Sequence, residues 1–217
     1  MGLFGRKKKE TSAEVGAEET KPEVKDVVEE APAPSHGPFD ISQRDVSKGY
    51  LDLGPLKLPA IAGIQIQPLF APDKKTIMRL NIVVGNSVLQ TIVAAAPKSG
   101  GAWKQILDGT QKSFEAQGGQ VIRNENGPWG EELLVQMPVK TPEGQDAIAP
   151  TRIVGVEGNR WVLRIDIVGG AVVDQKAFEA VAALINLMVV ERDSEPRPPL
   201  SIIPFVIPAE LASQAGQ

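Results

Sequence analysis

The chain has 217 residues, a net charge of −4 and no cysteine. This length suits one domain with tails or at most two small domains, and 42% hydrophobic residues suit a globular core. The negative charge provides no electrostatic attraction to nucleic acid, and the lack of cysteine excludes disulfides, thiol catalysis and zinc–thiolate sites. No apolar run is long enough to span a bilayer.

The first 36 residues differ in composition from the remainder. Arg6, Lys7, Lys8 and Lys9 form a basic start, and the residues around them fit neither a secretory signal nor the myristoylation pattern. So short a cluster predicts a solvated start, with weak contact to an anionic membrane surface as the alternative. Residues 10–35 are acidic and contain no aromatic residue, so burial cannot offset the entropy of ordering them.

We therefore predict three regions in a cytoplasmic protein. Residues 1–36 form a disordered basic-then-acidic tail, residues 37–208 form a single α+β domain, and residues 209–217 form a flexible C-terminal tail.

The folded part begins with strand patterns. Residues 51–70 are apolar, but three prolines exclude a long helix there. Alternation over residues 63–67 predicts a short strand. Residues 77–84 and 87–95 are two β-rich runs, and Gly85-Asn86 between them indicates a two-residue hairpin turn.

Two helices are predicted further along the chain. Over residues 101–117 apolar side chains recur at steps of three and four, and Gly118-Gly119 ends this pattern. Residues 174–187 form a second amphipathic pattern with Asp174 as its N-cap. A short strand is predicted over residues 188–190.

Two more hairpins lie between the predicted helices. One pairs residues 121–125 with 132–139, and the other pairs 151–156 with 160–167 through Gly158-Asn159. Because hairpins dominate, we predict an α+β fold: a mostly antiparallel sheet with two amphipathic helices packed on one of its faces.

The proline-rich segment after residue 192 allows two interpretations. Leaving its large apolar side chains in water would cost about 1.5–3 kcal/mol each, so we predict that the segment packs along the domain. The alternative is recognition of a polyproline helix, because Pro196 and Pro199 have the P-x-x-P spacing.

The sequence contains no recognised catalytic motif. His36 is the single histidine, and there is no phosphate-binding glycine loop. We therefore name no catalytic residue, no cofactor and no metal ligand. Glu131 and Glu132 are adjacent on a predicted strand, so they should point to opposite faces and cannot serve one proton-transfer site.

Five residues form the candidate binding surface. Arg160, Arg164 and Asp166 share the polar face of one strand, which is either the solvent side of the sheet or an arginine-bearing docking surface. Trp129 lies in a hairpin turn with Glu131 beside it. Its indole either covers the core at the sheet edge or anchors a partner.

Four segments of the sequence together resemble a known family. They are HGPFD (36–40), YLDLGPLKLP (50–59), GPWGEEL (127–133) and VEGNRWVLR (156–164). In this order they resemble the actinobacterial family catalogued as domain of unknown function 3710. The resemblance implies a cytoplasmic bacterial protein with no assigned activity. The predicted architecture also resembles, by fold-level analogy alone, the Mog1/PsbP-like α-β-α sandwiches, which are commonly non-catalytic binding modules.

The sequence therefore favours a non-catalytic protein-binding or adaptor module. The alternative is a small-ligand-binding protein, or an enzyme whose site is assembled from dispersed Asp, Glu and Arg residues. A pocket that gathers carboxylates with perturbed pKa values would favour the alternative. A flat polar face beside an apolar patch would favour the adaptor.

Overall fold

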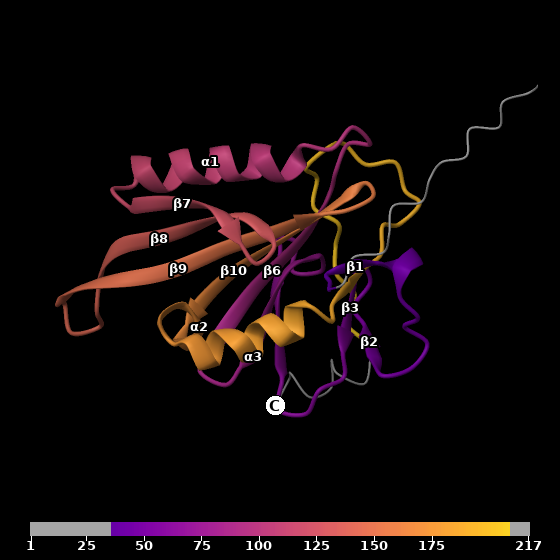
Figure 1. The fold of residues 1–217 in the computed structure, drawn as a ribbon, viewed down its shortest axis with the longest axis horizontal. Helices are drawn as coiled ribbons and strands as arrows, with labels where there is room; N and C mark the ends of the chain where they lie inside the picture. Colours follow the sequence, from indigo (N-terminus) through magenta and orange to yellow (C-terminus); the bar gives the residue numbers. More distant parts are fainter. Residues whose placement is uncertain (1–35, 209–217) are drawn as a thin grey trace, which may run out of the picture. The chain divides into compact units, whose positions relative to one another are not determined.

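The computed structural model describes residues 36–208. The predictions made for the basic start, the acidic tail and residues 209–217 lie outside this range. The described residues form two sheets, a long one with seven strands and a small one with four (Figure 1). Most of the strand pairs are antiparallel, and the predicted α+β class is confirmed.

The seven-stranded sheet is antiparallel throughout, with the order β4-β5-β6-β10-β9-β8-β7. Its predicted hairpins are confirmed, and the β5–β6 hairpin has the predicted bounds. The strands are β4 (Gln65–Phe70), β5 (Ile77–Val84), β6 (Ser87–Ala95), β7 (Gln120–Gly127), β8 (Gly130–Lys140), β9 (Asp146–Glu157) and β10 (Trp161–Gly169).

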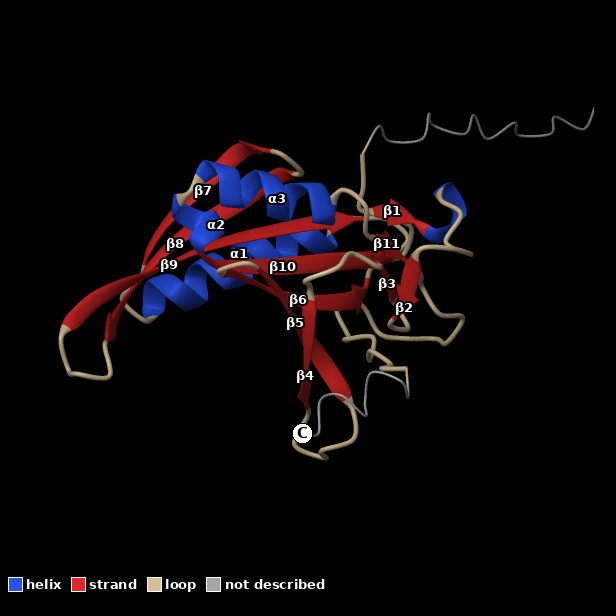
Figure 2. Ribbon diagram, turned by 90° about the horizontal axis from the view of Figure 1, so that it is seen from below, coloured by secondary structure: helices blue, strands red, loops and turns tan. Residues whose placement is uncertain are grey.

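The two long helices cover opposite faces of this sheet, so the prediction that both lie on one face is wrong (Figures 1 and 2). Helix α1 (Ala102–Ala116) packs its Trp103 and Leu107 on one face, and α3 (Gln175–Ile185) packs on the other. The sheet requires a layer on each side because its strands are apolar on both faces. Val162 of β10 belongs to the α1 core, for example, whereas the next residue, Leu163, belongs to the α3 core.

Helix α3 begins as predicted, because the Asp174 carboxylate accepts a hydrogen bond of 2.7 Å from the Ala177 N–H. The short helix α2 (Gly170–Val173) precedes it and follows directly after β10. The sequence did not predict α2. None of the described helices has both the length and the apolarity required to cross a membrane.

The four-stranded sheet has the order β1-β11-β3-β2. It brings the first described strands, within residues 39–59, together with the short strand that follows α3. Its first strand is parallel to β11, with Phe39 opposite Val189. The strands are β1 (Phe39–Asp40), β2 (Tyr50–Asp52), β3 (Leu56–Pro59) and β11 (Val189–Val190), and the short 3-10 helix η1 (Ile41–Gln43) follows β1.

A buried lysine ties this small sheet together. The Lys57 ammonium lies 2.6 Å from carboxylate oxygens of Asp52 and Glu191. Burial by itself lowers the pKa of Lys57, but these two carboxylates outweigh it and hold the pKa above its ordinary value. Lys57 is therefore a structural cation.

The C-terminal segment packs along the domain, as predicted. The backbone N–H of Ile203 donates to Val93 of β6, and that of Phe205 donates to Ile77 of β5, so the segment pairs with both strands where they separate. Ile203 and Phe205 are buried.

Candidate functional site

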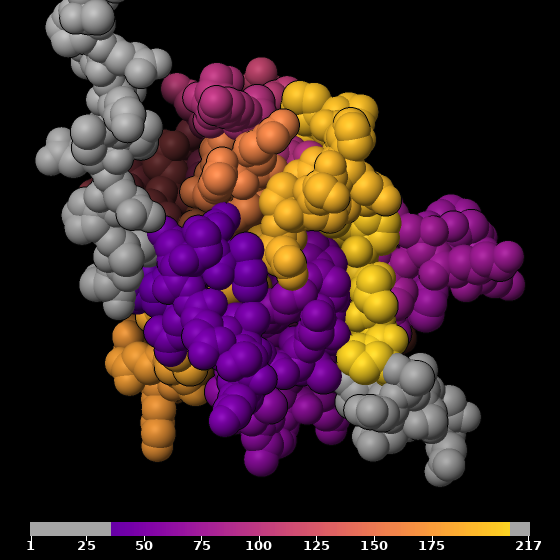
Figure 3. Space-filling view, turned by 90° about the vertical axis from the view of Figure 1, so that its right-hand side faces the viewer, coloured from indigo at the N-terminus to yellow at the C-terminus, as the bar shows by residue number. Residues whose placement is uncertain are grey.

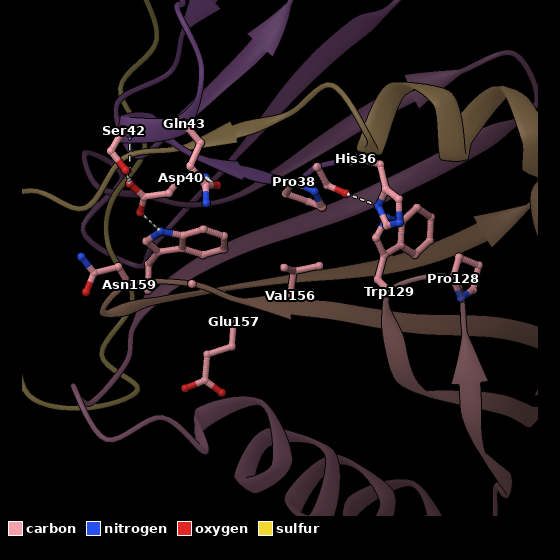
Figure 4. Close-up of a pocket in the computed structure, with 13 residues that line it drawn as sticks. His36, Pro38, Asp40, Ser42, Gln43, Pro128, Trp129, Val156, Glu157 and Asn159 are labelled. Atoms are coloured by element: carbon pink, nitrogen blue, oxygen red, sulfur yellow. Dashed lines mark hydrogen bonds between the residues drawn. The ribbon is translucent and has the colours of Figure 1, made fainter. Parts of the chain in front are cut away.

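A pocket of about 420 Å³ opens at one end of the seven-stranded sheet (Figure 4). We call it the Asp40–Trp129 pocket after the residues at its two ends. Three segments meet there, and the first and last of them lie side by side on the surface shown in Figure 3. The lining residues are His36, Gly37, Pro38, Asp40, Ser42 and Gln43 from the first segment, Pro128 and Trp129 from the second, and Val156, Glu157, Gly158, Asn159 and Trp161 from the third.

Asp40 fixes one end of the pocket. Its Oδ1 accepts hydrogen bonds from the Ser42 N–H (3.0 Å) and hydroxyl (2.7 Å), and its Oδ2 accepts one of 2.7 Å from the Trp161 indole. The Gln43 side chain accepts from the Asp40 N–H and completes a capping box at η1. Partial burial by itself raises the pKa of Asp40. The bonds from Ser42 and Trp161 outweigh it and hold the pKa below its ordinary value, so the carboxylate stays ionised at neutral pH.

Trp161 forms the inner wall at this end. Its ring is packed against Gly158, where an added Cβ would lie 2.2 Å from two ring carbons. The glycine at position 158 is therefore needed for close packing. The turn lies one residue later than predicted, because Gly158 pairs with Trp161 and Asn159-Arg160 form the two-residue loop. The indole is 1% exposed, and its N–H is used by Asp40.

Trp129 forms the opposite end of the pocket. It lies in the two-residue turn of the β7–β8 hairpin, between the paired Gly127 and Gly130, so the predicted hairpin turn is confirmed. The indole is half-buried and packs edge-to-face on Phe178 of α3, with ring centroids 6.2 Å apart. Its N–H donates to Asn186 Oδ1 at 2.8 Å. The side chain thus covers part of the α3 core and also lines the pocket.

A buried ion pair lies behind Trp129. Glu132 is 1% exposed and accepts two hydrogen bonds from the Arg152 guanidinium, at 2.8 and 2.9 Å. Asn124 donates a third at 2.7 Å, and the guanidinium lies 3.9 Å from the centroid of the Phe178 ring. This cluster supports the α3 side of the pocket wall. Arg152 was not predicted as a site residue, because its partner Glu132 lies on another strand.

Glu157 lies in the third segment of the pocket, but its carboxylate binds helix α1. Its carboxylate accepts hydrogen bonds from the N–H groups of Ala102 (3.1 Å) and Trp103 (3.0 Å), which begin α1. The N-cap of α1 is Gly101, which has no side chain to perform this role. Glu157 therefore caps the helix from β9.

The remaining predicted site residues do not gather at the pocket. Glu131 points to the α1 face and binds Arg123 at 3.1 and 3.2 Å, so the prediction that Glu131 and Glu132 face opposite sides is confirmed. Arg164 binds Asp166 through two bonds of 2.7 and 2.9 Å and donates to Thr110 of α1. An exposed polar ladder was expected here. That expectation is wrong for Asp166, which is 8% exposed because α1 and its neighbours cover it.

The prediction that Arg160 shares a strand face with Arg164 and Asp166 is wrong, because β10 begins at Trp161 and Arg160 lies exposed in the β9–β10 turn with a backbone φ of 65°. It does not line the pocket. The predicted surface is thus distributed over both faces of the sheet, and Trp129 is its one member at the pocket. Asp40, Asn159 and Trp161 were missed as site residues, although the sequence motifs HGPFD and VEGNRW contain them.

The fold and the pocket define a class of protein: a mostly antiparallel α+β domain with helices on both faces of its long sheet and a pocket built by three distant segments. The chain belongs to the family described as "Protein of unknown function (DUF3710)", whose model matches residues 37–214. No curated protein matches the chain.

Proposed function

We propose that the chain is a non-catalytic protein-binding module of the cytoplasm, and that a segment of its partner enters the Asp40–Trp129 pocket. One observation carries the proposal. Three of the four segments that carry the family resemblance, around residues 36–40, 127–133 and 156–164, meet at this pocket although they are far apart in sequence.

The composition of the pocket supports binding of a protein segment. Its lining carries a half-buried tryptophan and an exposed proline, Pro128, at one end, and the polar side chains of residues 42–43 at the other. Tryptophan at the edge of a concave, partly apolar surface is the residue type that dominates binding energy at protein interfaces. A volume of about 420 Å³ accommodates one or two side chains of a partner.

The carboxylates at the pocket already serve as structural acceptors. Asp40 holds η1 and Trp161, and Glu157 holds the first turn of α1. A general acid or base needs a pKa close to the working pH, whereas the pKa of Asp40 is shifted away from neutrality. These roles favour a binding surface over a proton-transfer site.

A second candidate is a small-ligand-binding protein, because the pocket volume lies within the range of small-molecule sites. Site-specific photo-crosslinking in the native cell separates the two. A benzophenone amino acid at Asn159, on the exposed rim, should give one discrete protein adduct. The same group at Glu143, exposed in the β8–β9 turn, serves as the matched control and should not give it.

Trp129→Ala should abolish the Asn159 adduct, and Trp129→Phe, which keeps an aromatic ring against Phe178, should retain part of it. Circular dichroism and thermal melts establish that each variant is folded. An identical adduct from both crosslinker positions, or an adduct unaffected by Trp129→Ala, would contradict the proposal.

A further inference from the structure

The Asp40–Trp129 pocket has two chemically different ends (Figure 4). At one end lie the oxygen-bearing side chains of Asp40, Ser42 and Asn159, and Asp40 accepts a hydrogen bond from the Trp161 indole there. At the other end lie Pro128 and Trp129, and Val156 lies between the two ends. An occupant that fits both ends has an apolar stem and a polar head that donates hydrogen bonds.

The charge of the lining favours a cationic head. The lining includes two acidic residues, Asp40 and Glu157, and no lysine or arginine. Glu157 is compensated by the N-terminus of α1. Asp40 is therefore the negative charge available to an occupant.

Asp40 retains capacity for another donor. A carboxylate offers about four lone-pair sites, and within residues 36–208 three hydrogen bonds reach this one, two at Oδ1 and one at Oδ2. The remaining site is on Oδ2, beside the Trp161 indole N–H.

The nearby arginines of the chain lie elsewhere. Arg44, four residues after Asp40, places its guanidinium carbon 5.0 Å from the centroid of the Phe39 ring. Arg160 does not line the pocket. It lies close enough to Arg192 to act on its pKa, which is lowered first by burial, then by the charge of Arg197 and then by that of Arg160. The oxygen-rich end of the pocket thus faces solvent without a cation of its own among the described residues.

We propose that the Asp40–Trp129 pocket takes an arginine side chain from a segment of the partner protein, an inference that rests on the proposed function. The guanidinium donates to Asp40 Oδ2 and to the oxygens of Ser42 and Asn159, and the methylene stem packs on Val156 toward Trp129. A guanidinium has five donors and no acceptor, which matches this set of oxygens. Arginine is favoured over lysine because its planar head is more weakly hydrated.

The test uses the ¹⁵N-labelled full chain and three blocked tripeptides, acetyl-Gly-Arg-Gly-amide and its lysine and glutamine counterparts. The indole N–H signals of Trp129 and Trp161 report on the pocket. The indole N–H of Trp103 donates to Glu131 O on the α1 face at 2.9 Å and serves as an internal control. We expect the arginine peptide to bind with a Kd of about 1 mM and the glutamine peptide about tenfold more weakly.

Two variants locate the charge. Asp40→Asn should abolish binding of the arginine peptide, whereas Asp45→Asn, which changes an exposed carboxylate five residues away, should leave it unchanged. An unshifted Trp103 signal shows that each variant keeps its fold. Should Asp40→Asn unfold the chain, the salt dependence decides instead: raising ionic strength from about 0.01 to 1 M should weaken the arginine complex severalfold.

Equal affinity for the arginine and glutamine peptides, or for the arginine and lysine peptides, would overturn the inference, as would a shift of Trp103 with no shift of Trp129. Loss of the inference and loss of the proposed function are distinguishable. If a rim crosslink to a partner persists while the arginine peptide does not bind, the arginine assignment fails and the binding module stands. If the peptide binds but no protein crosslinks, the protein-binding proposal fails.

Discussion

Replacing Arg152 with alanine should destabilise the chain far more than removing another cation from the same β8–β9 hairpin. The Glu132 carboxylate is 1% exposed and accepts two of its three hydrogen bonds from Arg152. In Arg152→Ala it would remain buried with Asn124 as its remaining side-chain donor. Breaking a buried ion pair in this way costs about 3–5 kcal/mol. Loss of the cation–π contact with Phe178 acts in the same direction.

The hairpin contains its own control. Lys140 and Asp146 pair across β8 and β9 at 2.6 Å, but their side chains are 65% and 89% exposed. An ion pair in water contributes about 0–1 kcal/mol, so Lys140→Ala should lower the free energy of unfolding by less than about 1 kcal/mol. The two substitutions therefore each remove the cation of an ion pair that joins β8 to β9, one pair buried and the other exposed.

Urea denaturation, followed by circular dichroism at pH 7, measures both free energies of unfolding. The double variant Glu132→Leu with Arg152→Met should recover most of the loss, because an apolar pair of similar volume leaves no charge buried. A loss in Arg152→Ala no larger than that in Lys140→Ala would refute the reasoning. The reasoning would also fail if the double variant lost as much free energy of unfolding as Glu132→Leu and Arg152→Met lose separately, added together.

Three further outcomes are expected. Gly158→Ala should lower the free energy of unfolding by about 1–3 kcal/mol, because its Cβ would collide with the Trp161 ring. Gly109→Ala places its Cβ in open space on α1, so it should raise the free energy of unfolding by about 0.4–1 kcal/mol in the same urea assay. The pKa of Asp40 is lowered by folding, so its stabilisation is present above about pH 3.9 and lost as pH falls through the lower folded pKa; thermal melts between pH 2 and 6 should show this loss in the wild type and its absence in Asp40→Asn. The pKa of Lys57 is raised, so its stabilisation is present below about pH 10.4 and lost as pH rises through the higher folded pKa; melts of Lys57→Met above pH 10 should lack that part of the decline.

Local signals in the sequence predicted the elements with good accuracy. The Gly85-Asn86 turn and its flanking β-rich runs give β5 and β6 with the expected bounds, because turn chemistry and alternation act over a few residues. Asp174 caps α3 for the same reason. The opposite orientation of Glu131 and Glu132 follows from the period of a strand alone.

The arrangement of those elements was beyond the same signals. The period of residues 101–117 shows that α1 has an apolar side, but it does not say which face of the sheet receives it. Both faces are apolar at β9, where Ile153 belongs to the α1 core and Val154 to the α3 core. The bond from Trp161 to Asp40 joins positions 121 residues apart, and neither residue carries a local indication of it.

Asn186 ties the two walls of the Asp40–Trp129 pocket together. This residue ends α3, and its side-chain oxygen accepts the Trp129 indole N–H at 2.8 Å while its backbone oxygen accepts the Gly37 N–H at 3.0 Å. One residue therefore positions the Trp129 end of the pocket and the segment that leads to Asp40. Phe39, next along that segment, is held by the Met188 carbonyl at 2.9 Å. Because both walls are tied to the same helix end, an occupant of the pocket would not have to order them, and this lowers the free-energy cost of binding.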